Sequence, residues 1–302
     1  MNIYVGIDGG GTKTKVCILN QDEQMIACAQ SGPSSIDTVD LIKAKNEILS
    51  AYEKATIDIE ESLEVVSVFA GLGGIRTSED SKNVEKILRE IPAFLNARIT
   101  AKNDTENALA SGLIFDEGLA LIVGTGMVCF GKDTLGHTHK SGGWGYKEGD
   151  AGSAYDLGFQ AIKSLARAID HRIEFTPFHQ RLWDTLAFSN PEDFIGILDA
   201  LYESRTDMAA LAPIVTQFAN QNDANALKIV DQATDELALV VHTVYKKLTL
   251  KDAVLVIIGS LGNADGIFKT QLHKKIKDLV PQIEIIPPLI DPAHGATLLA
   301  KR

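Results

Sequence analysis

The chain has 302 residues, 45% of them hydrophobic, and this length predicts two lobes that each bury a core. Its net charge of −11 repels phosphodiester backbones and anionic lipid, and no run of Lys or Arg offsets that charge locally. We therefore expect no nucleic-acid partner and no membrane partner. The longest later apolar run, residues 253–258, is too short to cross a bilayer. No signal-like segment precedes the first glycine turn, so a cytoplasmic protein is the expectation.

The three cysteines, Cys17, Cys28 and Cys129, are odd in number, widely spaced and set in apolar, strand-like surroundings. Free cysteine is among the most buried residue types, and such a pattern is typical of thiols in a core. We predict buried, reduced thiols, which fit a reducing compartment.

The first third of the chain predicts an alternation of strands and helices. Three β-prone runs, separated by a glycine turn and by a polar turn, predict an antiparallel meander. Two helices and two further strands follow, each with the apolar spacing typical of its type. The predicted elements are strands 3–7, 15–19, 25–30, 65–70 and 98–101 and helices 39–55 and 81–91.

Much the same order, βββαβαβ, recurs from residue 119 in a larger version, so we predict an internal structural duplication. The larger copy holds an all-helical insertion at about residues 151–250. Within it, segment 173–190 is expected to turn irregularly, and 216–247 predicts one long helix or two. The other predicted elements are strands 119–123, 127–131, 138–141, 253–258 and 283–286 and helix 268–279.

An apolar strand runs into a Gly-rich turn with hydroxyl residues twice, at residues 3–14 and 119–126. Glycine lets backbone N–H groups approach phosphate oxygens, and short hydroxyl side chains add donors. The implied ligand is a nucleotide gripped by two half-molecules. A plain hairpin turn is the alternative for the first segment, and the matching second turn weighs against it. The candidate phosphate residues are Gly10, Gly11, Thr12 and Lys13 in the first turn, with Thr14 as a further hydroxyl donor, and Gly124, Thr125 and Gly126 in the second.

Two aspartates end predicted strands or follow them closely. Asp8 ends the first strand beside the glycine turn, where a carboxylate next to phosphates would hold Mg²⁺ through water. Asp104 follows strand 98–101, where a general base would meet a sugar hydroxyl. Asp is also a preferred helix N-cap, and an apolar helix follows Asp104. The local sequence leaves base and cap open.

Two further glycine-rich segments are candidate binding loops. In loop 141–153, Asp150 could accept hydrogen bonds from vicinal hydroxyls while Trp144 covers the C–H groups of a ring. Alternatively, Asp150 is only an N-cap and Trp144 only a core anchor. The turn from Gly259 to Gly262 follows a buried strand and is a candidate for contact with adenine and ribose.

Together with Asn103-Asp104, Gly142-Gly143-Trp144-Gly145 and Ala293-His294-Gly295-Ala296, these motifs resemble the N-acetylglucosamine kinase branch of the BadF/BadG/BcrA/BcrD ATPase family over essentially the whole chain. The resemblance implies an α/β, duplicated RNase-H-like (actin-like ATPase) fold with two lobes, a central cleft and a helical insertion in the second lobe. The implied lobes are residues 1–104 and 105–290, with a C-terminal helix at 291–302 packing back on the first lobe.

The resemblance also implies residue roles. Asp104 would be the base, Asp8 would address the metal, and the two glycine turns would bind the phosphates. The chain departs from the family's pattern at Met127-Val128, at Ala151, and near residues 34–37, where Ser34, Ser35 and Asp37 stand in place of a sugar-binding Asn. The implied adenosine residues are Gly259, Ser260 and Gly262, and the implied sugar residues are Ser35, Asp104, Gly143, Trp144 and Asp150.

The activity implied by the resemblance is ATP- and Mg²⁺-dependent phosphorylation of an amino-sugar hydroxyl, with N-acetylglucosamine or N-acetylmuramic acid as acceptor. Glucosamine or another hexose is the alternative, and the expected partner is this small sugar, with a homodimer as one expected assembly. More distant alternatives are a non-catalytic sugar sensor and an ATP-driven activator of a redox enzyme. The activator would need cysteine ligands for an iron–sulfur cluster, and Cys17, Cys28 and Cys129 are not suitably placed.

Overall fold

The computed structural model describes residues 1–113, 117–147, 150–190, 194–250 and 253–302. By its internal contacts the chain forms two compact units, Met1–Asp116 with Ile286–Arg302 (unit 1) and Glu117–Ile285 (unit 2). These boundaries differ from the predicted ones at 104/105 and 290/291. The reason is helix α3 (Thr105–Leu113), which packs against the C-terminal helix α12 (Pro292–Lys301) and so lies in unit 1.

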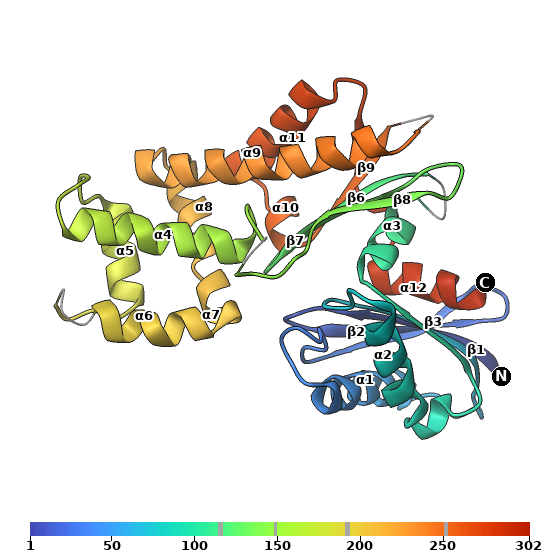
Figure 1. Cartoon of the computed structure of the whole chain (residues 1–302). Helices are drawn as coiled ribbons and strands as arrows, with labels where there is room; N and C mark the ends of the chain where they lie inside the picture. The colour runs from blue at the N-terminus through green and yellow to red at the C-terminus, as the bar shows by residue number, and fades with distance from the viewer. Residues whose placement is uncertain (114–116, 148–149, 191–193, 251–252) are drawn as a thin grey trace. The chain divides into compact units, whose positions relative to one another are not determined.

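Unit 1 is built on a five-stranded sheet in the order β3-β2-β1-β4-β5. β1 pairs antiparallel with β2, and β2 antiparallel with β3, while β1, β4 and β5 are parallel. Figure 1 shows α1 and α2 on one side of this sheet and α12 on the other. The bounds are β1 Asn2–Gly9, β2 Thr14–Asn20, β3 Met25–Ser31, β4 Glu64–Leu72, β5 Arg98–Lys102, α1 Leu41–Thr56, α2 Ser78–Arg89 and the 3₁₀ turn η1 Pro92–Phe94.

Alternation along the strands and helical spacing along α1 direct apolar side chains into one core. Ile3, Val5 and Ile7 of β1 are fully buried, as are Ala44 and Ile48 of α1. The Asp40 carboxylate accepts from the Lys43 backbone N–H in the first turn of α1, which fixes the start of this helix.

Helix α12 lies against β1 at a point where only glycine fits. A Cβ on Gly6 would lie 2.3 Å from the Thr297 backbone nitrogen and 2.4 Å from the Ala293 carbonyl oxygen. The carboxylate of Asp291 caps α12 by accepting from the backbone N–H of Ala293 at 3.0 Å. Residues 286–302 therefore complete unit 1, although they are far from it in sequence.

Unit 2 repeats the sheet of unit 1. Its strand order is β10-β9-β6-β7-β8. When β6, β7, β8, β9 and β10 are matched in turn to β1, β2, β3, β4 and β5, this is the order of unit 1 read from the opposite edge of the sheet. β6 and β7, and β7 and β8, pair antiparallel, while β6 and β9 are parallel. The predicted duplication is confirmed by this equivalence. The bounds are β6 Gly118–Val123, β7 Met127–Lys132, β8 Thr138–Gly142, β9 Val254–Ile258, β10 Glu284–Ile286, α10 Ser260–Asn263 and α11 Ile267–Leu279.

A helical insertion separates β8 from β9, and its long helix α9 lies beside α11 (Figure 1). The predicted helical region 216–247 divides between α8 and α9. The prediction of an irregular segment at 173–190 was wrong, because α5 forms there with Pro177 in its first turn, where no N–H is needed. The bounds are α4 Ala154–Ile169, α5 Pro177–Thr185, α6 Phe194–Glu203, α7 Arg205–Ala209, α8 Ala212–Asn220 and α9 Ala224–Lys247.

The prediction of three reduced thiols was wrong for two of them. Cys17 of β2 and Cys28 of β3 are directly opposite in the antiparallel ladder, with Cα atoms 4.2 Å apart, and form a disulfide. Cys129 is the buried free thiol that was predicted, and burial raises its pKa. Among the helices that the structure describes, none is both long and apolar enough to traverse a bilayer.

Candidate functional site

In unit 1, the loops that follow β1, β3, β4 and β5 meet at one edge of the sheet. The N–H of Gly73, after β4, donates to the Gly9 carbonyl at 2.8 Å, and the N–H of Ser35, after β3, donates to the Gly10 carbonyl at 3.1 Å. The Asn103 side-chain amide donates to the Ile75 carbonyl at 2.9 Å and so holds the β5 loop to the β4 loop. Two backbone hydrogen bonds and one side-chain hydrogen bond thus connect the four loops.

The first glycine turn is closed by a bond from the Gly10 N–H to the Lys13 carbonyl at 2.9 Å. Thr12 and Lys13 are exposed and available to a ligand. Thr14 is fully buried, and its hydroxyl bonds to the Gly32 carbonyl at 2.6 Å and to Ser34 Oγ at 2.7 Å. The prediction that Thr14 adds a phosphate donor was therefore wrong, because this hydroxyl fastens the turn to the loop after β3.

Asp8 lies at the end of β1 with its carboxylate against the side chain of Asn107, whose Nδ2 donates to Asp8 Oδ1 at 2.9 Å. Burial raises the pKa of Asp8 to about 6, the bond from Asn107 opposes that rise, and the nearby Asp291 carboxylate adds to it. Asp291 accepts from Lys15 at 3.0 Å. Asp8 thus combines a desolvated negative charge with a neutral amide partner.

Asn107, which the sequence analysis did not assign a role, sits in a slot formed by two strands. Its Nδ2 also lies 3.1 Å from the Ile7 carbonyl and 3.3 Å from the Gly71 carbonyl. A Cβ on Gly71 would come within 2.3 Å of the Asn107 amide, so glycine at 71 makes room for it. The sequence offered one signal for Asn107. It lies three residues after Asp104, so both residues belong to the start of α3.

Asp104 immediately precedes α3, and its carbonyl accepts from the Ala108 N–H at 3.0 Å, as an N-cap residue's carbonyl does. Its carboxylate also faces the edge where the loops meet. A Cβ on Gly73 would lie 3.5 Å from Asp104 Oδ2 and 2.7 Å from Ser35 Oγ. The cap position and a carboxylate directed at the loop edge therefore coexist in one residue.

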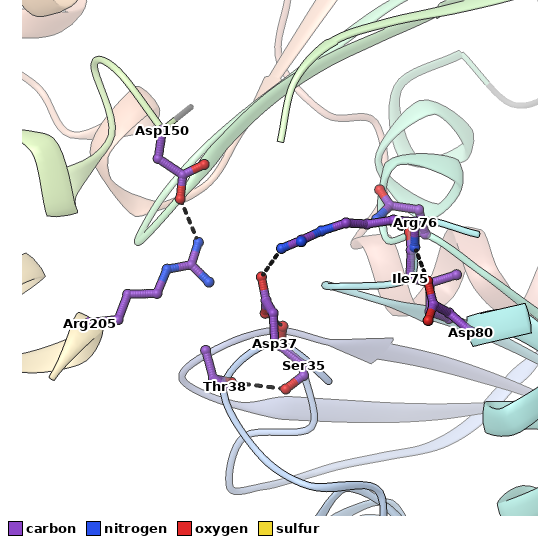
Figure 2. A network of polar contacts seen from close by, with 9 residues as sticks. Ser35, Asp37, Thr38, Ile75, Arg76, Asp80, Asp150 and Arg205 are labelled. Carbon is purple, nitrogen blue, oxygen red and sulfur yellow. Dashed lines mark hydrogen bonds and ion pairs between the residues drawn. The ribbon is translucent and has the colours of Figure 1, made fainter. Parts of the chain in front are cut away.

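Ser35 is buried, and its hydroxyl donates to the carboxylate of Asp37 (Figure 2). The Ser35 carbonyl accepts from Thr38 Oγ1 at 3.0 Å, and Asp37 Oδ2 lies 3.5 Å from a guanidinium nitrogen of Arg76. These bonds fix the loop after β3. Arg76, which sequence reasoning missed, brings a positive charge to this group from the loop after β4.

In unit 2, the second glycine turn is fastened to the start of α4. The Gly124 N–H donates to the Gly126 carbonyl at 2.9 Å, which closes the turn. The Ala154 N–H donates to the Gly124 carbonyl at 2.9 Å, and the Tyr155 N–H to the Thr125 carbonyl at 3.3 Å. The first-turn N–H groups of α4 thus satisfy carbonyls of the turn.

The turn after β9 packs on the residue before this second motif. Gly259 has φ of 102°, and a Cβ there would lie 2.2 Å from the Val123 carbonyl oxygen, so the position needs glycine. A Cβ on Gly262 would lie 3.2 Å from Val123 Cβ. Ser260 is exposed at the start of α10. The structure thus brings the predicted adenosine turn and the second phosphate turn together.

Asp150 forms a buried ion pair with Arg205, whose Nη2 lies 2.9 Å from Asp150 Oδ2 (Figure 2). Only 2% of the Asp150 side chain and 13% of the Arg205 side chain are exposed. A Cβ on Gly126 would lie 2.9 Å from Asp150 Oδ2 and 2.1 Å from Arg205 Nη2. The alternative of Asp150 as helix cap was wrong, because Ser153 caps α4 through its hydroxyl.

The loop after β8 passes beside the residues that follow the second turn. Gly143 has φ of 67°, and a Cβ there would lie 3.1 Å from Val128 Cβ. Trp144 is 69% exposed, so the alternative of a core anchor was wrong. The Lys140 ammonium lies 5.4 Å from the centre of the Trp144 ring, which leaves the aromatic group on a surface with a cation above it.

A sequence profile of the BadF/BadG/BcrA/BcrD ATPase family matches residues 5–300. The chain belongs to this family. An N-acetylmuramic acid/N-acetylglucosamine kinase of Clostridium acetobutylicum is 31% identical, over 100% of this chain and 99% of that protein. An N-acetyl-D-glucosamine kinase of Dictyostelium discoideum is 32% identical, over 99% of this chain and 97% of that protein.

Solved structures support the fold. A putative N-acetylglucosamine kinase of Chromobacterium violaceum superposes with a TM-score of 0.81 at 22% identity, over 98% of both chains. A ROK family glucokinase of Streptomyces griseus superposes with a TM-score of 0.58 at 12% identity, over 99% of this chain and 98% of that one. The BadF/BadG/BcrA/BcrD chain therefore has the two-lobe α/β fold of sugar kinases and actin-like ATPases, as predicted.

Proposed function

We propose that the protein transfers the γ-phosphoryl group of ATP to a hydroxyl of an amino sugar, with N-acetylglucosamine or N-acetylmuramic acid as acceptor. Relatives named for these sugars match the chain at 31% and 32% identity over nearly their whole length. Glucosamine is the second candidate, because a glucosamine kinase of Vibrio cholerae is 25% identical over 99% of this chain.

The observation that carries the proposal is the placement of Asp104. A general base must reach the proton that it removes, and the Asp104 carboxylate is directed at the edge where the four loops of unit 1 meet. Asp104 would accept the proton of the attacking hydroxyl. Ser35, held by Asp37, would contribute to sugar binding on the same edge.

Asp8 and Asn107 fit a hydrated Mg²⁺. The Asp8 carboxylate is desolvated, lies near a second carboxylate and has its pKa raised to about 6, all of which a divalent cation would relieve. Asn107 Oδ1, in the amide that binds Asp8, is buried with no hydrogen-bond partner in the described part of the chain. Mg²⁺ keeps several waters and takes one or two carboxylates beside phosphates. When bound, it would neutralise phosphate charge; Asp8 would hold it through water.

The nucleotide would use both glycine turns. In unit 1, Gly10, Gly11, Thr12 and Lys13 would bind phosphate oxygens through backbone N–H groups, a hydroxyl and an ammonium. In unit 2, Gly124–Gly126 would bind phosphates and Gly259, Ser260 and Gly262 would contact adenosine. This division is supported by the packing of the Gly259–Gly262 turn on Val123, the residue that precedes Gly124. Gly143, Trp144 and Asp150 would bind the sugar.

The test is a screen for ADP release with ATP and Mg²⁺ over N-acetylglucosamine, N-acetylmuramic acid, glucosamine, N-acetylmannosamine and glucose. We expect turnover with N-acetylglucosamine, with N-acetylmuramic acid or with both. Sugar binding without ADP release would favour the sensor. An activator of a redox enzyme is disfavoured, since Cys17 and Cys28 are joined and Cys129 is buried in a strand.

A further inference from the structure

We infer that Arg205 is a positioning residue for sugar recognition, holding the Asp150 carboxylate in place and ionised beside the second phosphate turn. The inference deepens the proposed function and rests on it. It starts from the ion pair itself, in which the Arg205 Nη2 and Asp150 Oδ2 atoms are 2.9 Å apart and both side chains are largely removed from solvent. A carboxylate buried in this way needs a partner to remain charged.

Arg205 reaches this place through the packing of the helical insertion. It begins α7, a five-residue helix whose start is fixed by the Ser204 hydroxyl, which accepts from the Asp207 N–H at 3.2 Å. The α7 carbonyl of Met208 presses on α4, where a Cβ on Gly158 would lie 2.0 Å from it. Helix α4 is in turn bonded to the second glycine turn through Ala154. The turn and the arginine therefore share one rigid support.

Two neighbours other than Asp150 hold the Arg205 guanidinium in its orientation. The Arg205 guanidinium carbon lies 5.7 Å from the centre of the Tyr146 ring, and that ring packs edge-on against Tyr155, the second residue of α4. The guanidinium also lies close to Gly126, where a Cβ would be 2.1 Å from Arg205 Nη2. A planar guanidinium can contact an aromatic ring and bind a carboxylate at the same time, which a compact ammonium does less well.

The consequence concerns two ligands at once. A carboxylate accepts hydrogen bonds at about four lone-pair positions, so the bond from Arg205 leaves Asp150 able to accept from sugar hydroxyls. The negative charge of Asp150 beside Gly126 would also repel a phosphate bound there, and the positive charge of Arg205 opposes that repulsion. Loss of Arg205 should therefore weaken sugar binding strongly and nucleotide binding weakly.

The experiment measures sugar and ATP-analogue affinity by calorimetry, with KM and kcat, for Arg205→Gln, Arg205→Lys, Asp150→Asn and the double variant Asp150→Asn/Arg205→Gln. We expect Arg205→Gln to weaken sugar affinity and raise the sugar KM tenfold or more, to change nucleotide affinity less than threefold, and to be partly rescued in Arg205→Lys. Arg172→Gln is the matched control, because Arg172 pairs with Asp170 on the exposed surface of the same unit.

The double variant keeps the test decisive if Arg205→Gln does not fold, because it removes the buried charge of Asp150 together with that of Arg205. If Arg205 acts through Asp150, the double variant should lose no more sugar affinity than Asp150→Asn alone. Unchanged sugar affinity in Arg205→Gln, or a nucleotide affinity that falls further in the double variant than in Asp150→Asn, would overturn the inference. A wild-type protein that binds sugar without ADP release would overturn the proposed function alone, since the affinities are measured without turnover.

Discussion

The two units repeat one sheet but differ in where the positive charge at their proposed phosphate turns comes from. In unit 1 the turn carries its own cation, Lys13, four residues from the strand that it follows. In unit 2 the turn Gly124–Gly126 has no charged residue, and the guanidinium beside it comes from Arg205, about 80 residues away in the helical insertion. A duplicated sheet therefore keeps the backbone of the proposed phosphate turn, while the charges depend on what is inserted into each copy.

The buried carboxylates of the two units differ in the same way. Asp150 has a cationic partner at 2.9 Å, whereas Asp8 accepts from the neutral Asn107 and has no ion pair within the described residues. Burial raises the pKa of Asp8, and the hydrogen bond from the neutral Asn107 offsets only part of that rise. The unit 1 carboxylate is left in need of a cation, and the unit 2 carboxylate already has one. Each of the predictions below would break or sharpen this comparison.

The largest effect is expected for Asp104→Asn, which tests whether unit 1 supplies the base. Asn is an equally good N-cap, so folding should be preserved, but it cannot accept the sugar proton, and kcat should fall about 10²–10⁴-fold with little change in binding. Steady-state rates, ligand affinities and thermal melting on one preparation provide the test.

Asp40→Asn is the control for this substitution, because Asp40 caps α1 of the same unit through an N–H bond of 2.8 Å and has no proposed catalytic role. Its kcat should match wild type. An Asp104→Asn protein that melts normally, binds both ligands and turns over within about threefold of wild type would remove Asp104 from the mechanism.

Asp8→Asn should cost activity and add stability. Loss of the carboxylate should weaken the response of the rate to Mg²⁺ by about 10–100-fold, as changes to groups that hold a metal through its outer shell do. At subsaturating Mg²⁺ the wild-type rate should decline as pH falls through about 6, where the metal-free Asp8 carboxylate takes up a proton, and the variant should lack this decline.

The stability effect of Asp8→Asn has a definite sign. The Asp8 pKa is raised from 3.8 to about 6 on folding, so the folded state binds more protons between these values and wild-type stability falls as pH rises through that window. The variant should be more stable than wild type at pH 7 by up to about 3 kcal/mol and nearly equal to it below pH 4. Urea unfolding at both pH values measures this, and equal stability at pH 7 would contradict burial of a charged Asp8.

The order of strands and helices along the chain and both glycine turns could be predicted because they depend on local patterns. Apolar runs and glycine dihedrals are properties of neighbouring residues, and the predicted strands match the observed ones to within a few residues. Arg205 was not found, because no local pattern tells which face of a distant helix will meet a turn. Asn107 was missed although its spacing from Asp104 offered a local signal. The Cys17–Cys28 disulfide was missed for the same reason as Arg205, since its formation depends on the register between two strands.

Gly158→Ala tests whether the position of the Arg205 guanidinium in unit 2 depends on the packing of α7 against α4. The added methyl would collide with the Met208 carbonyl, so α7 must move and carry Arg205 with it. We expect sugar affinity to fall severalfold and stability to fall by about 2 kcal/mol, as overpacked sites do. The control is Gly196→Ala in α6, where an added Cβ meets nothing within 4 Å and should be neutral or slightly stabilising. Equal sugar affinity in both variants would show that the packing of α7 on α4 does not determine how Arg205 supports sugar binding.

The smallest effect concerns the disulfide, which distinguishes otherwise equivalent strand pairs. Cys17 of β2 faces Cys28 of β3, whereas Cys129 of β7 faces Ser141 of β8. Cys28→Ser gives unit 1 the Cys–Ser pairing of unit 2 and should lower stability by about 2 kcal/mol, because the unfolded chain is no longer constrained. Turnover should stay within about twofold of wild type, since β3 is an edge strand and its loop bonds remain.

A reductant should lower the stability of wild type to the level of the Cys28→Ser variant and leave the stability of the variant unchanged. Unfolded wild type without reductant should expose one reactive thiol, that of Cys129, and three thiols under these conditions would show that the disulfide had not formed.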